Sequence, residues 1–592
     1  MLLLDVTIVN VALPSIERDL GADFSDLQWV IDAYALTLAG LLLAAGSLAD
    51  KVGRRLVFML GLAIFTASSL ACGLAPDPLF LNVSRAAQGI GGAMMFGTSL
   101  ALIAQEFQGR ERGTALGIWG ATTAAAVSTG PLVGGALVDA LSWRWIFLVN
   151  VPIGLAALVV ARLRLRESRD PAAAGVDLRG VALLCPALFL LVYALIRGNE
   201  EGWGSALIIG CFAASALLLV LFVVVERRAA DPLLDLSLFR KPAFTGATIV
   251  GFALSASIFS MFLYITLFFQ NVLGFSPFEA GLRSLPVTGP ILFVSPLSGR
   301  LTARVPVRLL LGTGLAFVTV GLLLMGNLSD SSGWTALLPG QILAGIGIGL
   351  ATPGLASTAV GVVRPQLSGM ASGANNTARQ LGLATGIAGL GSIFQSKIES
   401  TLTPLVAGTS ASSHVHELSR AVASGGTGRA LQAVPPADRD KVVDAAHHAF
   451  VTGFNTIALV SVAVAAVGSV AGYALVRSRD FVAGRRPGGG SRSRRPGDRS
   501  GEPPHGRGHP GDGDSGCRAL VRRESPSPPR RGRSRLSALT RRGSFSSTEA
   551  LVAGNWSGRA GLHQRPAAAR DAAGERRRLP LRRELGRAPR PR

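Results

Sequence analysis

Long apolar runs are the feature that most restricts the fold of this chain. Each run is close to the ~20 residues that a helix needs to cross a bilayer. Lipid cannot satisfy open backbone groups, and the strands of a membrane barrel would be shorter and would alternate in polarity. An all-α integral membrane protein with about fourteen transmembrane helices is therefore predicted. The runs lie near residues 1–20, 28–49, 56–75, 79–105, 113–139, 145–162, 178–196, 205–225, 243–270, 279–299, 308–328, 335–359, 369–395 and 449–476.

Lys and Arg in the short loops set the expected orientation, because cytoplasmic loops carry an excess of them. With the N-terminus inside, the outer loops hold little beyond Arg18, Arg144 and Arg197. We therefore expect a multi-pass protein of the cell (plasma) membrane, with both termini cytoplasmic. The inner loops hold Lys51, Arg54, Arg55, Arg110, Arg112, Arg162, Arg164, Arg166, Arg169, Arg227, Arg228, Arg240, Lys241, Arg300, Arg304, Arg308 and Arg364.

The basic character of the chain is concentrated in its C-terminal tail. Residues 478–592 hold 28 Arg, no Lys and 10 acidic residues, so +18 of the net charge of +22 lies there. The tail is rich in Arg, Pro, Gly and Ser and has no apolar periodicity, which predicts disorder. It is either an unselected extension, such as a frameshift in a GC-rich gene produces, or a segment that contacts anionic lipid. Binding to nucleic acid is disfavoured.

Sites for metal or enzyme chemistry are not expected. Residues 396–448 form the longest interhelical segment and are predicted to face outside. Their four histidines, His414, His416, His447 and His448, lack a supporting ligand set, so no metal site is predicted. The sequence has no Gly-rich Lys-Ser/Thr loop for ATP and no catalytic Ser, His and Asp grouping, so no cofactor is expected beyond the proton discussed below.

The loop between the second and third runs carries the first informative motif. It reads Gly46-Ser-Leu-Ala-Asp50-Lys-Val-Gly53-Arg54-Arg55. Glycines allow close approach and a tight turn, and Asp50 can cap a helix or pair with a cation. The motif resembles the loop signature of the major facilitator superfamily, which implies a gating latch that is closed when the protein faces outward. A weaker version of the motif, which lacks the Asp, begins at Gly299. Such a repeat is expected if the chain consists of two related halves.

Two further motifs lie inside apolar runs. Arg85 begins Arg85-Ala-Ala-Gln88-Gly89-Ile-Gly91-Gly92, and an Arg within a membrane helix is by default a functional candidate. It resembles the fourth-helix motif of the superfamily, whose Arg is linked to proton transfer. The fifth run contains Ser128-Thr129-Gly130-Pro131-Leu-Val-Gly134-Gly135, which allows a kink and close helix contact. This segment resembles the antiporter signature of exporters and disfavours an importer.

Two other segments narrow the resemblance. Leu4-Asp5-Val-Thr7-Ile-Val-Asn10-Val-Ala-Leu13-Pro14 and Trp143-Arg144-Trp145-Ile-Phe147-Leu-Val-Asn150-Val-Pro152-Ile-Gly154 resemble the fourteen-helix drug:proton antiporters, the EmrB/QacA family. The resemblance covers about residues 1–477. It implies two six-helix bundles with two accessory helices between them. The predicted domains are 1–165, 166–240 with the accessory helices, 241–477 including the outer segment 396–448, and the tail 478–592.

The resemblance implies a proton-coupled efflux transporter, not an enzyme, that exports amphipathic, often cationic drugs by alternating access. Asp5 is the carboxylate predicted to couple protons, because burial favours its protonated form. Asp32 is a second candidate or merely lines the outer mouth, and Arg379 is the expected second-half counterpart of Arg85. The alternatives are a dedicated exporter of an endogenous metabolite or antibiotic, and a membrane-anchored binding or sensory protein that uses the basic tail. Small molecules, protons and membrane lipid are the expected partners.

The first helix departs from the family pattern. Only Met1 to Leu4 precede Asp5, whereas family members have a longer apolar lead. Asp5 is therefore expected at the cytoplasmic end of a helix that is barely long enough to span. We expect the native protein to begin upstream, which N-terminal mass analysis of the native protein can test.

Overall fold

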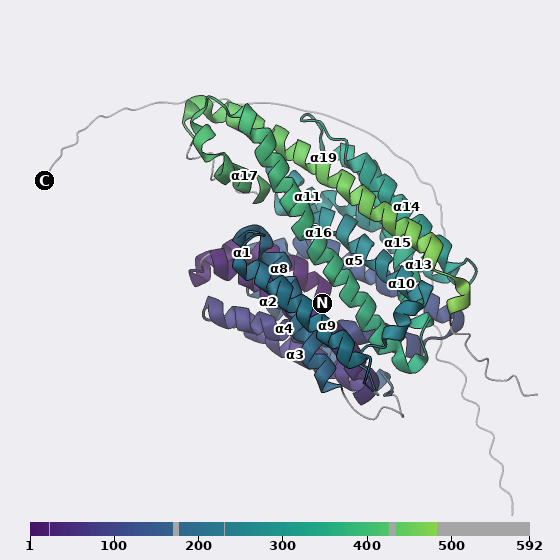
Figure 1. Ribbon diagram of the computed structural model, residues 1–592. Helices are drawn as coiled ribbons and strands as arrows, with labels where there is room; N and C mark the ends of the chain where they lie inside the picture. Colours follow the sequence, from purple (N-terminus) through teal and green to yellow (C-terminus); the bar gives the residue numbers. More distant parts are fainter. Residues whose placement is uncertain (23, 170–176, 230, 425–433, 482–592) are drawn as a thin grey trace, which may run out of the picture. The chain divides into compact units, whose positions relative to one another are not determined.

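The computed structural model describes residues 1–22, 24–169, 177–229, 231–424 and 434–481, and in these residues it contains helices and no strand. Each of the fourteen predicted runs coincides with one helix or with a series of consecutive helices (Figure 1). Ten segments among the described residues are long and apolar enough to cross a membrane. The all-helical membrane fold is confirmed. The tail, apart from residues 478–481, lies outside the described residues.

The first six spans form one group of helices. In this group α2 packs on α4, α3 on α4 and α7, and α1 on α5. The helices are α1 (Leu2–Leu20), α2 (Phe24–Val52), α3 (Arg54–Gly73), α4 (Pro78–Glu106), α5 (Gly109–Ala140), α6 (Trp145–Leu148) and α7 (Asn150–Arg164), the last two making one span.

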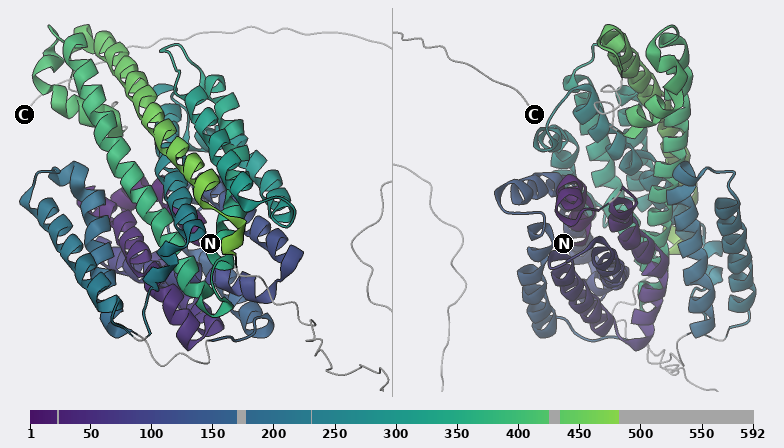
Figure 2. Two further views of the ribbon diagram at one scale, coloured as in Figure 1. Left: turned by 45° about the vertical axis from the view of Figure 1, so that its right-hand side comes forward. Right: turned by 90° about the vertical axis from the view of Figure 1, so that its left-hand side faces the viewer.

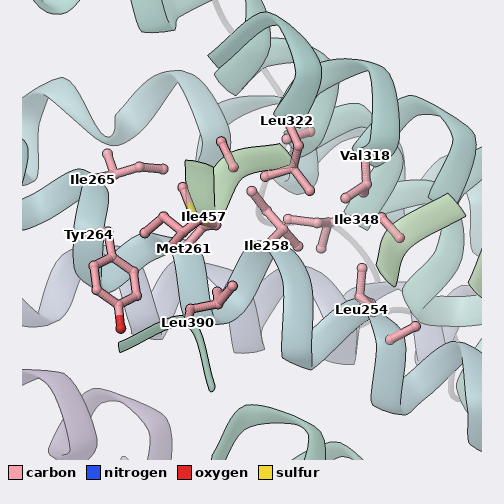
Figure 3. Close-up of a cluster of buried hydrophobic side chains, with 14 of the residues drawn as sticks. Leu254, Ile258, Met261, Tyr264, Ile265, Val318, Leu322, Ile348, Leu390 and Ile457 are labelled. Atoms are coloured by element: carbon pink, nitrogen blue, oxygen red, sulfur yellow. The ribbon is translucent and has the colours of Figure 1, made fainter. Parts of the chain in front are cut away.

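The last six spans form a second group, with α14 against both α15 and α19 and with α10 against α16 and α19. Its members are α10 (Pro242–Leu254), π-helical turns η2 (Ser255–Phe259) and η3 (Phe268–Val272) on either side of α11 (Ser260–Leu267), α12 (Pro277–Arg283), α13 (Leu285–Leu301), α14 (Val307–Met325), α15 (Leu338–Gly361), α16 (Ser368–Leu405) and α19 (Pro436–Leu475). Figure 3 shows part of its apolar core, in which Ile258, Leu322 and Ile348 meet from three segments.

The accessory helices α8 (Leu178–Glu201) and α9 (Ala206–Glu226) form a hairpin between the two groups in the sequence. The buried residues of α9 are confined to one face, at Ile208, Cys211, Ser215, Phe222 and Glu226, so most of this very apolar helix is exposed. Such exposure is expected for a helix that faces lipid. In contrast, α8 packs against α2 of the first group and α16 of the second (Figures 1 and 2).

Parts of the polar segment 396–448 are helical, although its low apolar content predicted an interhelical segment. Helix α16 continues to Leu405, α17 covers Val415–Ser424, and α19 already begins at Pro436. Hydropathy detects only the lipid-facing part of a helix, so it misses extensions that stand in water. We call the end of the bundle near Lys51, Arg240 and Arg364 the basic end, and the opposite end the far end.

Candidate functional site

A buried polar network in the first group is built around the Asp5 carboxylate. Arg85 Nη1 donates to Asp5 Oδ2 at 2.5 Å. Gln88 Nε2 and Asn150 Nδ2 both donate to Asp5 Oδ1, at 3.1 and 3.3 Å. Asp5 and Gln88 are 0% exposed, and Arg85 and Asn150 are 1% exposed. The structure therefore brings together two of the predicted site residues, Asp5 and Arg85, with two amide side chains from the quoted motifs.

Arg85 makes further contacts besides the ion pair with Asp5. Its Nε donates to the Val30 carbonyl at 2.9 Å, its Nη1 also reaches Gln88 Oε1 at 2.6 Å, and its guanidinium carbon lies 4.3 Å from the centre of the Tyr34 ring. Ser69 Oγ accepts from Gln88 and Asn150 and donates to the Phe147 carbonyl. A buried ion pair is tolerated where additional hydrogen bonds satisfy its polar atoms, and here both Asp5 oxygens and the Nε and Nη1 atoms of Arg85 are hydrogen-bonded. Apart from the bond between Arg85 and Gln88, which lies within α4, these bonds join different helices, so the network depends on how the helices are packed.

Asp5 lies in the first turn of α1, as the short apolar lead predicted, but this turn is deep in the bundle. Leu2 Cδ1 lies 3.2 Å from the point at which a Cβ on Gly92 would stand, and Gly92 is midway along α4. The partner Arg85 lies seven residues, or about 10 Å, inside the far end of α4. Asp5 is thus inside the bundle rather than at its basic end. The register of α1 is decided by its packing on its neighbours, which the length of its apolar lead does not show.

The glycines of the fifth-helix motif hold α5 against α1 beside Asp5. A Cβ on Gly130 would overlap the Thr7 side chain, and one on Gly134 would lie 2.7 Å from Ile8 Cγ1. A Cβ on Gly135 would meet nothing within 4 Å. Two of the three glycines therefore allow the close approach that the motif predicted, and the third does not contribute to it. Pro131 lies within α5 between them.

The motif at residues 46–55 joins the two groups at the basic end. Asp50 Oδ1 accepts from Gly369 N at 2.9 Å, and Asp50 Oδ2 accepts from Met370 N at 2.8 Å. A carboxylate at these first-turn amides is stabilised by the positive end of the helix dipole. Arg54 Nε donates to Asp50 at 2.8 Å, and Arg54 Nη2 reaches the carbonyls of residues 365 and 366. We call Asp50, Arg54 and residues 365–370 the latch.

Glycines allow the helices to approach closely enough for the latch to form. A Cβ on Gly46 would overlap the Gly369 carbonyl, so α2 and α16 touch along their backbones. Gly53 has φ +140°, a conformation that side chains other than glycine rarely adopt. The next turn is capped by Glu167, which accepts from Arg55 N and Leu56 N at 3.0 Å. Glu167 was not predicted, because its partners are about 110 residues away in the sequence.

A second seam between the two groups lies at the basic end between α5 and α13. A Cβ on Gly113 would overlap the Gly299 carbonyl, and Ser295 Oγ donates to the Gly117 carbonyl at 2.9 Å. Gly299 opens the weaker version of the motif, which lacks the Asp. The two seams are therefore similar in their glycine contacts, and the carboxylate latch belongs to the α2–α16 seam.

Asp32 has a different partner from Asp5. Its Oδ2 lies 4.0 Å from Arg197 Nε of α8, and both side chains are largely buried, at 14% and 10% exposure. The sequence analysis counted Arg197 as an outer-loop residue because the apolar run ends at residue 196. That placement was wrong: α8 continues to Glu201, and Arg197 packs inside it.

Arg379 stands in the second group without a carboxylate in the described part of the chain. Its guanidinium carbon lies 5.9 Å from the centre of the Phe259 ring, its stem packs on Gly251, and its buried Nε has no hydrogen-bond partner. Arg85 and Arg379 thus both lie within helices. Of the two, only Arg85 pairs with a carboxylate among the described residues. Elsewhere, His416 lies 3.3 Å from Glu399 and His448 lies 2.8 Å from Asp330, both at exposed positions.

Comparisons with known proteins agree with this architecture. The family model described as Major Facilitator Superfamily matches residues 1–387, and the chain belongs to this superfamily. It is 38% identical over 405 residues to the multidrug resistance protein Stp of Mycobacterium tuberculosis, covering 68% of this chain and 75% of the relative. It is 38% identical to the puromycin resistance protein pur8 of Streptomyces alboniger, covering 66% and 79%. The probable actinorhodin transporter of Streptomyces coelicolor is 36% identical, covering 68% and 72%.

The resemblance predicted from the motifs is therefore confirmed, and the chain is a multi-pass membrane transporter.

Proposed function

We propose that this protein is a proton-coupled exporter of amphipathic, often cationic compounds, working by alternating access across the plasma membrane with its basic end in the cytoplasm. The observation that carries the proposal is the Asp5–Arg85 network, a fully buried ionisable pair inside a membrane bundle. Ionisable groups in this setting are costly and typically mark proton or substrate pathways. The names of the multidrug-resistance relatives support export of drugs.

The proton step follows from the bonding of Asp5. An ionised Asp5 accepts three hydrogen bonds, from Arg85, Gln88 and Asn150. A proton on the carboxyl removes its charge and one of its acceptor positions, so the attraction that holds α1 to α4 and α7 weakens. Protonation therefore changes the relative stability of two packings of the first group, which is what coupling requires.

The latch supplies the second part of the cycle. Asp50 and Arg54 hold the α2–α16 seam shut at the basic end, as an outward-facing transporter needs. Exposure of the substrate site to the cytoplasm requires these bonds to break. In alternating access the latch thus opens as contacts form at the far end, and closes again as those contacts break. Protons bind to and leave Asp5 during this cycle, and Asp32 is a second candidate for the proton-binding residue.

A dedicated exporter of one metabolite or antibiotic is the second candidate function. It is favoured by relatives named for single compounds, such as tetracenomycin C, methylenomycin A and actinorhodin. Both candidates are transporters with the same coupling site, and they differ in the range of compounds exported.

The test is efflux of a fluorescent cationic dye from cells that lack their own pumps, with and without a protonophore. Asp5→Asn should abolish gradient-dependent efflux at equal membrane expression, because the amide of Asn cannot exchange a proton. Asp19→Asn is the matched control: it lies in the same helix but is exposed and pairs with Arg144. Efflux that continues unchanged after the gradient is collapsed would contradict the proposal. Well-expressed protein that exports none of the dyes but exports one antibiotic would favour the dedicated exporter.

A further inference from the structure

The accessory hairpin contributes a charged cluster to the first group at its far end. Arg197 Nη1 donates to Glu200 Oε2 at 2.6 Å and to Gln28 Oε1 at 2.8 Å, while its Nε faces Asp32 at 4.0 Å. Gln28 also donates to Glu200, and the Trp29 ring lies 5.3 Å from the guanidinium carbon. One cation is therefore shared by two carboxylates, one on its own helix and one on α2.

The two carboxylates are held unequally. Glu200 is 42% exposed and directly hydrogen-bonded to Arg197, whereas Asp32 is 14% exposed and has an ion-pair distance that is too long for a hydrogen bond. In the described part of the chain, Arg197 is the only ion-pair partner of Asp32. Burial disfavours a charge on Asp32, and the cation 4.0 Å away favours it, so a change at Arg197 alters the balance between these two effects.

The surroundings of Asp32 otherwise carry no described charge. The charged groups that act on it are Arg197 and Glu200, both from α8. Helix α16, which packs on α2 nearby, presents the apolar Leu381 and Ala384 to a hydrophobic cluster of α2 and α8, formed by Leu36, Ala39 and Val192. On the other side of α2, Arg85 is occupied by Asp5 and the Val30 carbonyl.

The same end of α8 is attached to the second group. Asn199 Nδ2 donates to the Ala388 carbonyl of α16 at 3.1 Å, and Trp203 Nε1 donates to Asn199 Oδ1 at 3.0 Å. Arg197 and Asn199 are two residues apart, so one turn of α8 touches α2 with a charge and α16 with an amide. A shift of α16 relative to α2 therefore either breaks the bond from Asn199 to Ala388 or changes the distance from Arg197 to Asp32.

We propose that Arg197 is a positioning residue for Asp32: its guanidinium, shared between Asp32 and Glu200, sets how readily Asp32 takes up a proton and makes this depend on the α2–α16 contact. The accessory hairpin is then part of the coupling machinery and not only a lipid-facing addition. This inference rests on the proposed function, in which Asp32 is a second proton-binding candidate.

Two substitutions should change the stability of the charged form of Asp32 in opposite directions. Arg197→Ala leaves Asp32 facing Glu200 without a cation, so its charged form is less stable. Glu200→Gln releases Arg197 to turn fully toward Asp32, so the charged form is more stable. If protons and a cationic dye compete for the protein, the midpoint pH of dye binding should rise by about one unit in the first variant and fall in the second.

The experiment measures binding of a fluorescent cationic dye to the purified full-length chain as a function of pH. Arg197→Lys keeps a cation and should stay near the wild-type midpoint. Arg144→Ala is the matched control, since it removes another far-end arginine, whose partner is Asp19. In an Asp32→Asn background, Arg197→Ala and Glu200→Gln should no longer move the midpoint.

The outcomes separate the two proposals. Opposite shifts that disappear in the Asp32→Asn background support the role of Arg197. An unchanged midpoint in a folded Arg197→Ala protein, or a shift that persists without Asp32, overturns it even if wild-type cells show gradient-dependent export. A wild-type protein without gradient-dependent export of any tested compound refutes the proposed function, and the inference fails with it.

Discussion

Loss of the Asp50 carboxylate should open the basic end of the protein. Asp50 makes two charge-assisted bonds across the seam, to Gly369 N and Met370 N, at a residue that is only 4% exposed. Bonds to charged groups contribute about 1.5–3 kcal/mol each. Asp50→Asn keeps the shape of the side chain but loses the charge and points an amide at backbone donors, so ~3 kcal/mol is a reasonable loss.

This free energy fixes the size of the expected change. At about 1.4 kcal/mol per factor of ten, ~3 kcal/mol changes the equilibrium between closed and open latch by about 150-fold. A protein that is ~99% closed at the basic end would become ~40% closed. The remaining Arg54 bonds to the carbonyls of residues 365 and 366 would hold the seam only weakly.

Pulsed electron paramagnetic resonance between spin labels can measure the change. Labels at Val52 of α2 and at Gln366, both exposed, lie on opposite sides of the seam. The wild type should give mainly one short distance, and Asp50→Asn should add a longer distance of comparable weight. Asp19→Asn at the far end should leave the distribution unchanged. An Asp50→Asn protein with the wild-type distribution would refute the latch reasoning.

Three further predictions concern packing, the buried pair and the tail. Gly134→Val should lower the thermal unfolding midpoint in detergent, because a side chain there overlaps Ile8 at a cost of about 1–3 kcal/mol, whereas Gly135→Val should leave the midpoint nearly unchanged. Arg85→Ala should destabilise the protein by about 3–5 kcal/mol by leaving Asp5 buried and unpaired, and adding Asp5→Asn should recover part of the loss, as a double-mutant cycle can measure. Deleting residues 482–592 should leave dye efflux intact. A cut after Arg477 should also lower stability by about 1 kcal/mol, since Asp480 Oδ2 accepts from Ala243 N in the first turn of α10.

Local features of the sequence were enough to predict the class of fold. The fourteen apolar runs coincide with helices, and ten segments among the described residues are long and apolar enough to cross a membrane, because the bilayer imposes a length and a composition on each helix separately. Helix starts can likewise be read locally: Asp77 caps α4 through Phe80 N, and Ser276 with Glu279 forms a capping box at α12. The loop and fourth-helix motifs also identified Asp50 and Arg85 as functional candidates, and the first-helix segment with its family resemblance identified Asp5.

Contacts between distant residues could not be predicted in the same way. Asp5 and Arg85 are 80 residues apart, and Asp50 and Gly369 are 319 apart. The position of Asp5 in the first turn of its helix was predicted, but its depth in the bundle was not, since that depends on which turn of α4 meets α1. Arg197 was placed in a loop because an apolar run ends where its first charge appears, while the helix itself continues.

The sequence by itself thus determined that the chain forms membrane helices, roughly where their apolar parts lie, and that Asp5, Asp32, Arg85 and Arg379 lie within them. Only the tertiary structure decided which of these charges are paired, because pairing depends on the rotation and depth of each helix against its neighbours. Asp5 obtained a tightly bonded partner, Asp32 a loosely held one from the accessory hairpin, and Arg379 no carboxylate among the described residues. These three environments differ through packing, which no single segment encodes.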